Sequence, residues 1–450
     1  EFDIKTAVAT AAEAILAEQP RIVGLGAHIW NVALIEPLVL LLKSERPDLL
    51  VVLGGPEITD RETSLTRAAD YAVRGEGEEV FRRLCAELLA GDRPAGRFLQ
   101  AAPADPSKLA LPYDLYSDAD LAHRITYVES SRGCPYQCDY CLSAGDAPVR
   151  HFPLPPLLDA LDRLLERGAR TLKFVDRTFN LDLERCRALL TFFLDRMRPG
   201  LFVHFEMVPD RFPDDVRDLL ARFPAGALQL EIGVQTFNPE VAARIRRPLR
   251  PEAVEENLSF LRNHTAAVLH TDLIVGLPGE TLESFAAGFD RLVRLEPHKI
   301  QVGILKKLPG ASLARHDRAW AMRYSPRPPY EVVSTSAMDE GTLAAVQRLA
   351  RYWELVVNRG RFPQTARLLW RGTGSPFAAF RGFSEWLFQR FGRDYGLPLT
   401  ELADALFEFL TAERGLGPEA VAERILGDYQ GPGRKDTPRR LRPYLGPPDQ

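Results

Sequence analysis

Three of the five cysteines in this 450-residue chain fall within eight positions, as Cys134, Cys138 and Cys141. Thiolates at the spacing C-x-x-x-C-x-x-C are typical ligands of an iron–sulfur cluster. No fourth cysteine lies near them in the sequence, so one iron of a 4Fe–4S cluster would be left open. Catalytic metal sites keep an open position, whereas structural sites are closed. The motif therefore predicts a catalytic 4Fe–4S cluster.

The alternative interpretation of the motif is a zinc site with His151 as the fourth ligand. Structural zinc usually takes two C-x-x-C pairs or a closely spaced Cys/His pair. This chain has one three-cysteine run and no second pair, which favours the cluster. The other two cysteines, Cys85 and Cys186, lie in helix-like segments and are expected to be small buried hydrophobic residues.

The composition is that of a globular protein without a membrane span or a nucleic-acid surface. No apolar run approaches the ~20 residues that a membrane helix needs. The formal net charge is −4 and the basic residues are scattered along the chain, which argues against nucleic acid. Sparse, clustered cysteines favour a reducing compartment, so we expect a cytoplasmic protein. The chain begins without Met and on a helix-like segment, so we expect residues, including a first strand, ahead of the printed start.

Apolar strands alternate with helical segments through two regions. In residues 1–105 three apolar runs each lead into glycine, which predicts a Rossmann-like, doubly wound parallel sheet. A proline-rich linker follows at 106–123. Residues 124–334 hold six βα units without a closing pair, which predicts a partial (βα)6 version of the TIM barrel. Strand patterns then disappear, and residues 335–450 are predicted to form a helical domain with an exposed tail. The six candidate barrel strands are 124–130, 170–175, 201–207, 227–234, 266–275 and 299–305.

Ligands of such sheets bind beyond the carboxyl ends of the strands, so residues after the strands are the candidate site. The cysteine motif directly follows the first barrel strand. Glu206 and Glu231 each end an apolar strand, where a buried carboxylate needs a partner. Asp176 also ends a strand, and pairing with the adjacent Arg177 is one role open to it.

The cysteine loop resembles the signature of the radical S-adenosylmethionine (SAM) superfamily, in which C-x-x-x-C-x-aromatic-C follows the first barrel strand. Three further segments are similar to motifs of that family in order and spacing, at 174–180, 231–236 and 272–281. The resemblance covers about 124–310. It implies that the reduced cluster cleaves SAM to a 5′-deoxyadenosyl radical, which abstracts a hydrogen atom from the substrate.

The resemblance also implies roles for residues at the strand ends. Cys134, Cys138 and Cys141 would ligate the cluster. Tyr140 would pack near the adenine and is, with Glu206, a candidate catalytic residue. The residues that would hold SAM, from its amino group through the ribose to the adenine, are Asp176, Glu231, Gln235, Gly276 and Pro278.

The first region resembles the cobalamin-binding domain of cobalamin-dependent radical SAM enzymes, closest to a bacterial group whose chemistry is poorly assigned. Its strand ends carry glycine loops, and glycine lets backbone approach a bulky ligand closely. No D-x-H-x-x-G motif is present, so no histidine is set up as a lower axial ligand. The alternative to cofactor contact is that His28 is a hydrogen-bonded loop residue and that Trp30 lies in the core. The residues expected to line cobalamin are His28, Trp30, Asn31, Gly54, Gly55, Pro56, Glu57, Gly75, Glu76, Gly77 and Glu78.

The resemblance implies an enzyme that methylates an unactivated carbon of a small molecule or peptide and receives electrons from a partner such as flavodoxin or ferredoxin. One alternative is a cobalamin-binding enzyme that catalyses a non-methylating rearrangement or cyclisation. Another is a non-catalytic Fe–S electron-transfer protein. A methylthiotransferase is disfavoured because the N-terminal region lacks a second three-cysteine set.

Overall fold

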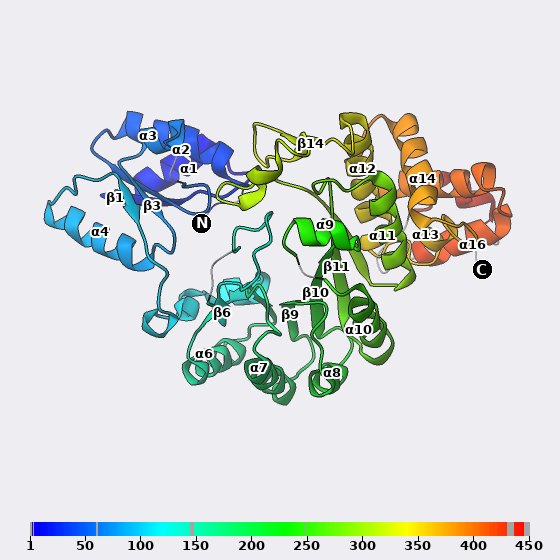
Figure 1. The fold of residues 1–450 in the computed structure, drawn as a ribbon, viewed down its shortest axis with the longest axis horizontal. Helices are drawn as coiled ribbons and strands as arrows, with labels where there is room; N and C mark the ends of the chain where they lie inside the picture. The colour runs from blue at the N-terminus through cyan, green and yellow to red at the C-terminus, as the bar shows by residue number, and fades with distance from the viewer. Residues whose placement is uncertain are drawn as a thin grey trace.

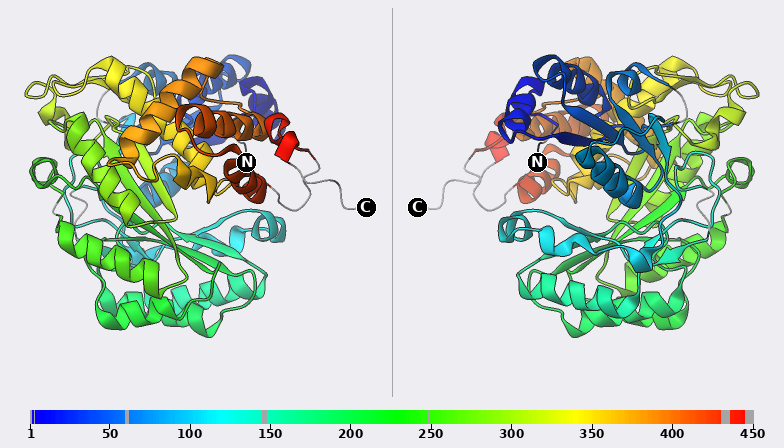
Figure 2. Two further views of the ribbon diagram at one scale, coloured as in Figure 1. Left: turned by 90° about the vertical axis from the view of Figure 1, so that its right-hand side faces the viewer. Right: turned by 90° about the vertical axis from the view of Figure 1, so that its left-hand side faces the viewer.

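The structure is a computed structural model, and it describes residues 2, 4–59, 62–144, 148–247, 249–429 and 436–444. An N-terminal α/β domain, a central half-barrel and a set of C-terminal helices follow one another along the chain (Figure 1). In both side views the N-terminal domain and the C-terminal helices lie on the same side of the half-barrel (Figure 2). Most of the tail predicted to be exposed lies outside the described residues. Its described part forms a 3-10 helix at Arg439–Tyr444 whose Leu441 is buried in the core, so the prediction was wrong there.

The N-terminal domain is a parallel four-stranded sheet in the order β1-β2-β3-β4 with helices on both faces. Apolar side chains of α1, α2 and α3 form a core on one face. Leu84 and Leu88 of α4 pack with Val73 on the other face, and the Rossmann-like prediction is confirmed. The bounds are α1 (Val8–Ala17), β1 (Ile22–Gly26), α2 (Val32–Glu45), β2 (Leu50–Gly54), α3 (Ser64–Ala68), β3 (Tyr71–Arg74), α4 (Glu78–Ala90) and β4 (Phe98–Gln100).

The half-barrel is an open sheet of six parallel strands in the order β12-β11-β10-β9-β8-β5, so all six predicted strands are confirmed. Burial alternates along β10, because the apolar residues face the outer helices and the polar ones face the lumen. The strands are β5 (Thr126–Val128), β8 (Thr171–Phe174), β9 (Phe202–Met207), β10 (Leu228–Gln235), β11 (Val268–Val275) and β12 (Lys299–Ile304). The helices are α6 (Leu154–Glu166), α7 (Leu183–Asp195), α8 (Asp214–Ala221), α9 (Pro239–Arg244), α10 (Pro251–His264) and α11 (Leu282–Arg294).

Short elements connect these parts. The linker holds α5 (Asp118–His123), and the cysteine loop is closed by an antiparallel ribbon of β6 (Ser131–Arg132) and β7 (Arg150–His151). After β12, a 3-10 turn at Ser312–His316 leads to a second ribbon of β13 (Arg323–Tyr324) and β14 (Val332–Ser334). Both ribbons therefore project from the carboxyl ends of barrel strands.

The C-terminal helices share one continuous hydrophobic core with the half-barrel. Phe289 of α11 packs edge-on against Trp353 and Phe377, with ring centroids 4.8 and 5.6 Å apart. In the described part of the chain no helix is long and apolar enough to cross a membrane. The helices are α12 (Glu340–Trp353), α13 (Thr365–Leu368), α14 (Pro376–Phe391), α15 (Leu399–Glu408) and α16 (Pro418–Tyr429), with π-helical turns at Glu354–Asn358 and Phe409–Glu413 and a 3-10 helix at Arg439–Tyr444.

Candidate cluster and cofactor sites

The cysteine loop leaves the half-barrel beyond the carboxyl end of β5, where the sequence predicts it. Cys134 and Cys138 are buried, and Cys141 is half-buried. The N–H of Cys141 donates to the Cys138 carbonyl over 3.0 Å, so the last two cysteines share one turn. Burial raises the pKa of the Cys134 thiol. Cations or a metal are therefore needed to hold it as the thiolate that ligates iron.

The donor set of this loop fits a cluster. Within the described residues, no group of three or more His, Cys, Asp or Glu side chains is arranged to hold a single metal ion. Three thiolates that bind three different irons of a cube do not need to converge on one point. His151, the ligand in the zinc alternative, instead turns its Nε2 atom toward Asp182 at 3.6 Å.

A half-buried arginine lies beside these cysteines. Arg247 places Nη1 4.0 Å from the sulfur of Cys138, and its Nη2 donates to the Gly233 carbonyl over 2.6 Å. Its guanidinium also lies over the Tyr136 ring, 5.8 Å from the centroid. A cation in this position stabilises a thiolate. The sequence analysis did not single out Arg247, because its contact with Cys138 spans 109 residues of chain.

Asp176 is buried at the end of β8 and holds the strand end that leads into the cysteine loop. Its carboxylate accepts from the Ser130 N–H over 2.9 Å, the Ser130 hydroxyl over 2.6 Å and the Ser131 hydroxyl over 2.5 Å. Pairing with Arg177 was wrong, because that arginine lies 3.9 Å from Glu206 instead. Contact of Asp176 with the SAM amino group remains a prediction, although serines already occupy both of its oxygens.

The two strand-end glutamates face the lumen as neighbours in register on β9 and β10, yet their surroundings shift their pKa values in opposite directions. The Glu231 carboxylate lies 2.9 Å from His204 Nε2 and accepts from Lys173 Nζ over 3.3 Å, and these partners lower its pKa to about 2. Glu206 lies 3.9 Å from Arg177, and burial raises its pKa to about 7. The lumen thus holds one firmly ionised carboxylate beside one that protonates near neutrality.

Asp272 adds an acceptor that is not hydrogen-bonded in the described structure. It lies on β11 opposite Gly233 of β10, and burial raises its pKa well above the usual range. His270 Nε2 is 3.5 Å away, and the Oδ1 atom of Asp272 has no hydrogen bond. SAM carries an ammonium, a sulfonium and two ribose hydroxyls. Glu206 and Asp272 are carboxylates without firm partners, so the lumen fits such a cationic, hydroxyl-bearing molecule.

The residues predicted to lie near the ribose and adenine are found close to the ends of β10 and β11, where the backbone is tightly packed. Gln235 has φ +71° at a bulge of β10. Gly276 has φ +86°, and a Cβ there would lie 2.6 Å from Val332. The Pro278 carbonyl accepts from Arg244 over 2.6 Å. Tyr140 is half-buried, and burial raises its pKa well above the usual value. Their contacts with SAM remain predictions.

An aromatic pair marks the end of β1 in the N-terminal domain. His28 stacks on Trp30 with centroids 4.5 Å apart and an interplanar angle of 16°. Trp30 is 64% exposed, so the alternative that placed it in the core was wrong. Asn31 fixes the loop by donating to the Gly26 carbonyl and accepting from the His28 N–H. An exposed flat pair beside glycine-rich strand ends fits a flat macrocycle such as a corrin.

Two other loops of this domain contain residues predicted to line cobalamin. At the end of β2, a Cβ at Gly55 would lie 2.5 Å from the Ala27 carbonyl oxygen, so this glycine is required by loop packing. Gly54 and Pro56 flank it. At the end of β3, Gly75 has φ +84° and Gly77 starts α4. For these residues contact with cobalamin remains a prediction.

The acidic residues of the same loops contact the central domain. Glu57 accepts from the Tyr330 hydroxyl over 2.8 Å. Glu76 pairs with Arg150 at 2.5 Å and with Arg132 at 3.3 Å. Because Arg132 precedes Cys134 by two positions, the β3 loop lies directly beside the cysteine ribbon. Glu78 also pairs with this arginine, at 2.6 Å. These carboxylates therefore already have partners, and their contact with cobalamin remains a prediction.

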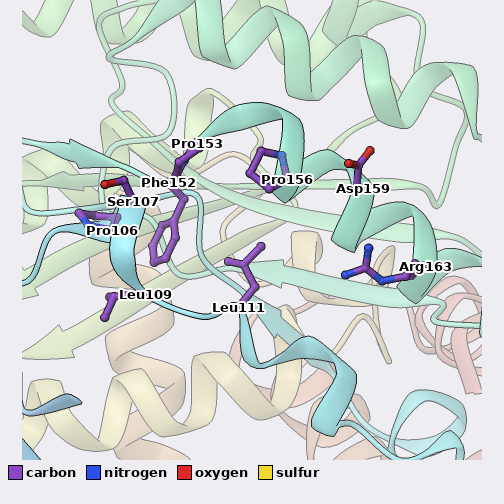
Figure 3. A pocket seen from close by; sticks show the side chains of 9 residues that line it. All are labelled: Pro106, Ser107, Leu109, Leu111, Phe152, Pro153, Pro156, Asp159 and Arg163. Atoms are coloured by element: carbon purple, nitrogen blue, oxygen red, sulfur yellow. The ribbon is translucent and has the colours of Figure 1, made fainter. Parts of the chain in front are cut away.

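A pocket of about 330 Å³ between the linker and α6 lies apart from these groups (Figure 3). It is lined by proline and leucine residues with Asp159 and Arg163 at one end, and it includes none of the predicted site residues. The predicted site residues of the half-barrel lie instead at the carboxyl ends of its strands.

Three family descriptions match successive parts of the chain. Residues 128–292 match the Radical SAM superfamily, residues 2–85 match the B12 binding domain, and residues 318–441 match a protein family of unknown function, DUF4080. The chain therefore contains a radical SAM domain at residues 128–292 and a cobalamin-binding domain at residues 2–85. Its cofactors are accordingly a 4Fe–4S cluster, SAM and cobalamin.

Two curated relatives are methyltransferases. The chain is 27% identical over 331 residues to the 2-(S-pantetheinyl)-carbapenam-3-carboxylate methyltransferase of Streptantibioticus cattleyicolor, covering 64% of this chain and 48% of the relative. It is 24% identical over 438 residues to the cobalamin-dependent radical SAM methyltransferase TokK of Streptomyces tokunonensis, covering 87% and 62%. The chain thus spans about half to three fifths of the length of these relatives.

Solved structures share the fold. TsrM from Kitasatospora setae, with cobalamin and a 4Fe–4S cluster bound, superposes with a TM-score of 0.60 at 16% identity over 85% of this chain and 90% of that chain. The cobalamin-dependent SAM radical enzyme OxsB superposes with a TM-score of 0.63 at 15% identity over 94% and 72%. At such identities the likeness shows the common architecture.

Proposed function

We propose that this protein is a methyltransferase that uses a 4Fe–4S cluster, SAM and cobalamin to methylate an unactivated carbon of a small molecule or peptide. The observation that carries the proposal is the contact between the two cofactor loops. Glu76, at the end of β3, is ion-paired with Arg132 and Arg150, which close the cysteine loop. A corrin at the β3 end would therefore lie next to the cluster. Two methyltransferases among the relatives support the same reaction.

When bound, the cofactors supply the electron, the 5′-deoxyadenosyl radical and the methyl group. The chain's own residues bind and orient them. The three thiolates hold the cluster, and Arg247 stabilises the charge at Cys138. Glu206 and Asp272 would accept hydrogen bonds from the ammonium and hydroxyl groups of SAM.

Glu231 has a different role. His204 and Lys173 keep its carboxylate ionised and oriented toward their own side chains. It holds the positions of these two side chains under the bound ligand. Glu206 is the lumen group that can exchange a proton near neutral pH, since burial raises its pKa to about 7. It is therefore the candidate catalytic acid or base.

The partners and location follow from the same chemistry. The lumen is lined by charged and polar side chains at the strand ends, which suits a small polar substrate or a peptide segment. A reducing partner such as flavodoxin or ferredoxin would supply the electron. A reducing cytoplasm would keep the cysteines free for cluster assembly.

Anaerobic reconstitution tests the proposal. The loaded protein should show cobalamin absorption and, with dithionite, convert SAM to both 5′-deoxyadenosine and S-adenosylhomocysteine. Cys138→Ser should lose the cluster and 5′-deoxyadenosine formation, whereas Cys85→Ser, at a half-buried cysteine outside the motif, should retain both. Formation of 5′-deoxyadenosine alone would favour a non-methylating radical reaction. Absence of SAM cleavage by the loaded protein would indicate an electron-transfer protein.

A further inference from the structure

Asp139, between two of the cluster cysteines, is fully buried with a relative exposure of 0%. Arg246 donates to one carboxylate oxygen from Nε over 2.8 Å and from Nη2 over 2.5 Å. The other oxygen contacts Arg315 Nη2 at 2.9 Å and His316 Nε2 at 2.7 Å. The main-chain N–H of Asp139 also donates to the Ile245 carbonyl over 3.0 Å. Both the side chain and the backbone of this residue are therefore held.

The groups that hold Asp139 come from two distant places in the chain. Arg246 follows α9, and Arg315 and His316 end the 3-10 turn after β12. This turn is itself fixed, because Arg315 donates to the Arg244 carbonyl over 3.0 Å and the Trp320 N–H donates to the His316 carbonyl over 3.1 Å. Two anchored elements thus converge on one residue of the cysteine loop.

The negative charge of Asp139 makes its contacts with the two anchored elements costly to break. A fully buried carboxylate is costly unless it is paired and hydrogen-bonded. Here two guanidinium groups and an imidazole occupy both oxygens, so Asp139 has no capacity left to ligate iron. Moving the loop outward would strip these partners from a buried charge. The backbone on either side of Asp139, which carries Cys138 and Cys141, is therefore restrained.

Cys134 is restrained by different contacts. The segment before it is held by Asp176 through Ser130 and Ser131. Loss of the Asp139 contacts would therefore release the second and third cysteines and leave the first in place. Release of Cys138 and Cys141 without release of Cys134 would therefore distinguish a local effect on the loop from a general loss of folding.

We propose that Asp139 is the positioning residue of the cluster loop, and that it holds Cys138 and Cys141 preformed before any metal binds. Arg246, Arg315 and His316 act through it. The inference rests on the proposed function only in taking the three cysteines as cluster ligands. It makes the β12–β13 segment a structural part of the cluster site.

Thiol alkylation of the full-length apoprotein under anaerobic conditions tests this role. With iodoacetamide and peptide mass spectrometry, Asp139→Asn should react about tenfold faster than wild type at Cys138 and Cys141, because the rate follows the local opening free energy. The rate at Cys134 should stay near the wild-type value. Reconstitution of the same variant should yield less bound iron and sulfide. Asp162→Asn, which removes a carboxylate of α6 paired with Arg196 after α7, is the matched control.

Wild-type alkylation rates at all three cysteines, with full iron loading of Asp139→Asn, would overturn the proposal. If the buried Cys186 also reacts faster, the Asp139→Asn variant is globally unfolded. Arg315→Met then tests the proposal in its place, because Arg246 and His316 still hold the Asp139 carboxylate in that variant. That variant should show the same selective pattern to a smaller extent; uniform rates would overturn the proposal. Failure of wild-type protein to bind a cluster would refute the proposed function without changing the labelling pattern.

Discussion

At the scale of single residues, the half-barrel shows how surroundings set the charge of one side-chain type. Glu231 and Glu206 are in register on adjacent strands. His204 and Lys173 lower the pKa of Glu231 to about 2, whereas burial raises that of Glu206 to about 7 even with Arg177 at 3.9 Å. A carboxylate without a firm partner at a strand end is available to a ligand. We therefore predict that Glu206 is the ligand-facing member of the pair.

The raised pKa of Glu206 predicts how stability changes with pH. In the unfolded chain a glutamate releases its proton near its ordinary pKa, about 4.3, but the folded apoprotein retains it up to about 7. The folded state therefore binds more protons between these values, and stability falls as pH rises through this window. The group should lower the free energy of unfolding of the wild type by about 2 kcal/mol between pH 5 and pH 8. Glu206→Gln lacks this titration, so its stability relative to wild type should rise by the same amount over this range.

Urea unfolding of the apoprotein at each pH measures this gain. The exposed Glu240→Gln variant serves as the control, because its side chain lies on the surface of α9. Parallel pH profiles for wild type and Glu206→Gln would contradict the assignment of a raised pKa.

At the scale of elements, the C-terminal helices protect an edge of the half-barrel. The six-stranded sheet is open, so β12 presents an edge that could pair with another chain. Asn358, in the π-helical turn after α12, accepts from the Ile300 N–H and donates to the Ile300 carbonyl, each over 3.0 Å. One side-chain amide thus takes the place of a neighbouring strand.

Replacing this amide should destabilise the protein. Asn358→Ala leaves a buried N–H and a buried C=O of Ile300 unpaired, which should cost about 2–4 kcal/mol. Asn263→Ala, at an exposed position of α10, should have a small effect. Urea unfolding followed by tryptophan fluorescence compares the two. Equal effects of the two substitutions would show that Asn358 does not protect the strand edge.

At the scale of the whole molecule, ion pairs join the cobalamin-binding domain to the cysteine loop. Arg132 contacts Glu76, Glu78 and Glu129 at 3.3, 2.6 and 2.9 Å. Tyr330 of the β13–β14 ribbon adds a second contact through Glu57. The N-terminal domain is thus tied to the central one through both ribbons, and the linker is not its only connection.

Removing the main contact should expose the linker to protease. Glu76→Gln should accelerate tryptic cleavage after the exposed Lys108 severalfold, because the domains separate more often. Arg150 and Arg132 lower the pKa of Glu76 to about 2. The wild-type contact is therefore present above the ordinary glutamate pKa and is lost as pH falls toward 2. Glu79→Gln, whose partner Arg82 lies within the same helix, should cleave at the wild-type rate. Unchanged cleavage of Glu76→Gln would show that other contacts hold the domains.

The sequence by itself determined the features that are set by patterns in consecutive residues. Apolar periodicity located all six barrel strands, because alternate burial along a strand leaves a record in consecutive residues. The spacing of Cys134, Cys138 and Cys141 predicted the cluster ligands for the same reason.

Only the tertiary structure decided how those residues are supported. His316 and Asp139 are 177 positions apart, and Arg150 and Glu76 are 74 apart. Pairs at such distances leave no local pattern. The sequence placed Asp176 and Glu206 at strand ends, but it could not assign their partners or protonation, because burial and charge contacts arise only when distant strands come together.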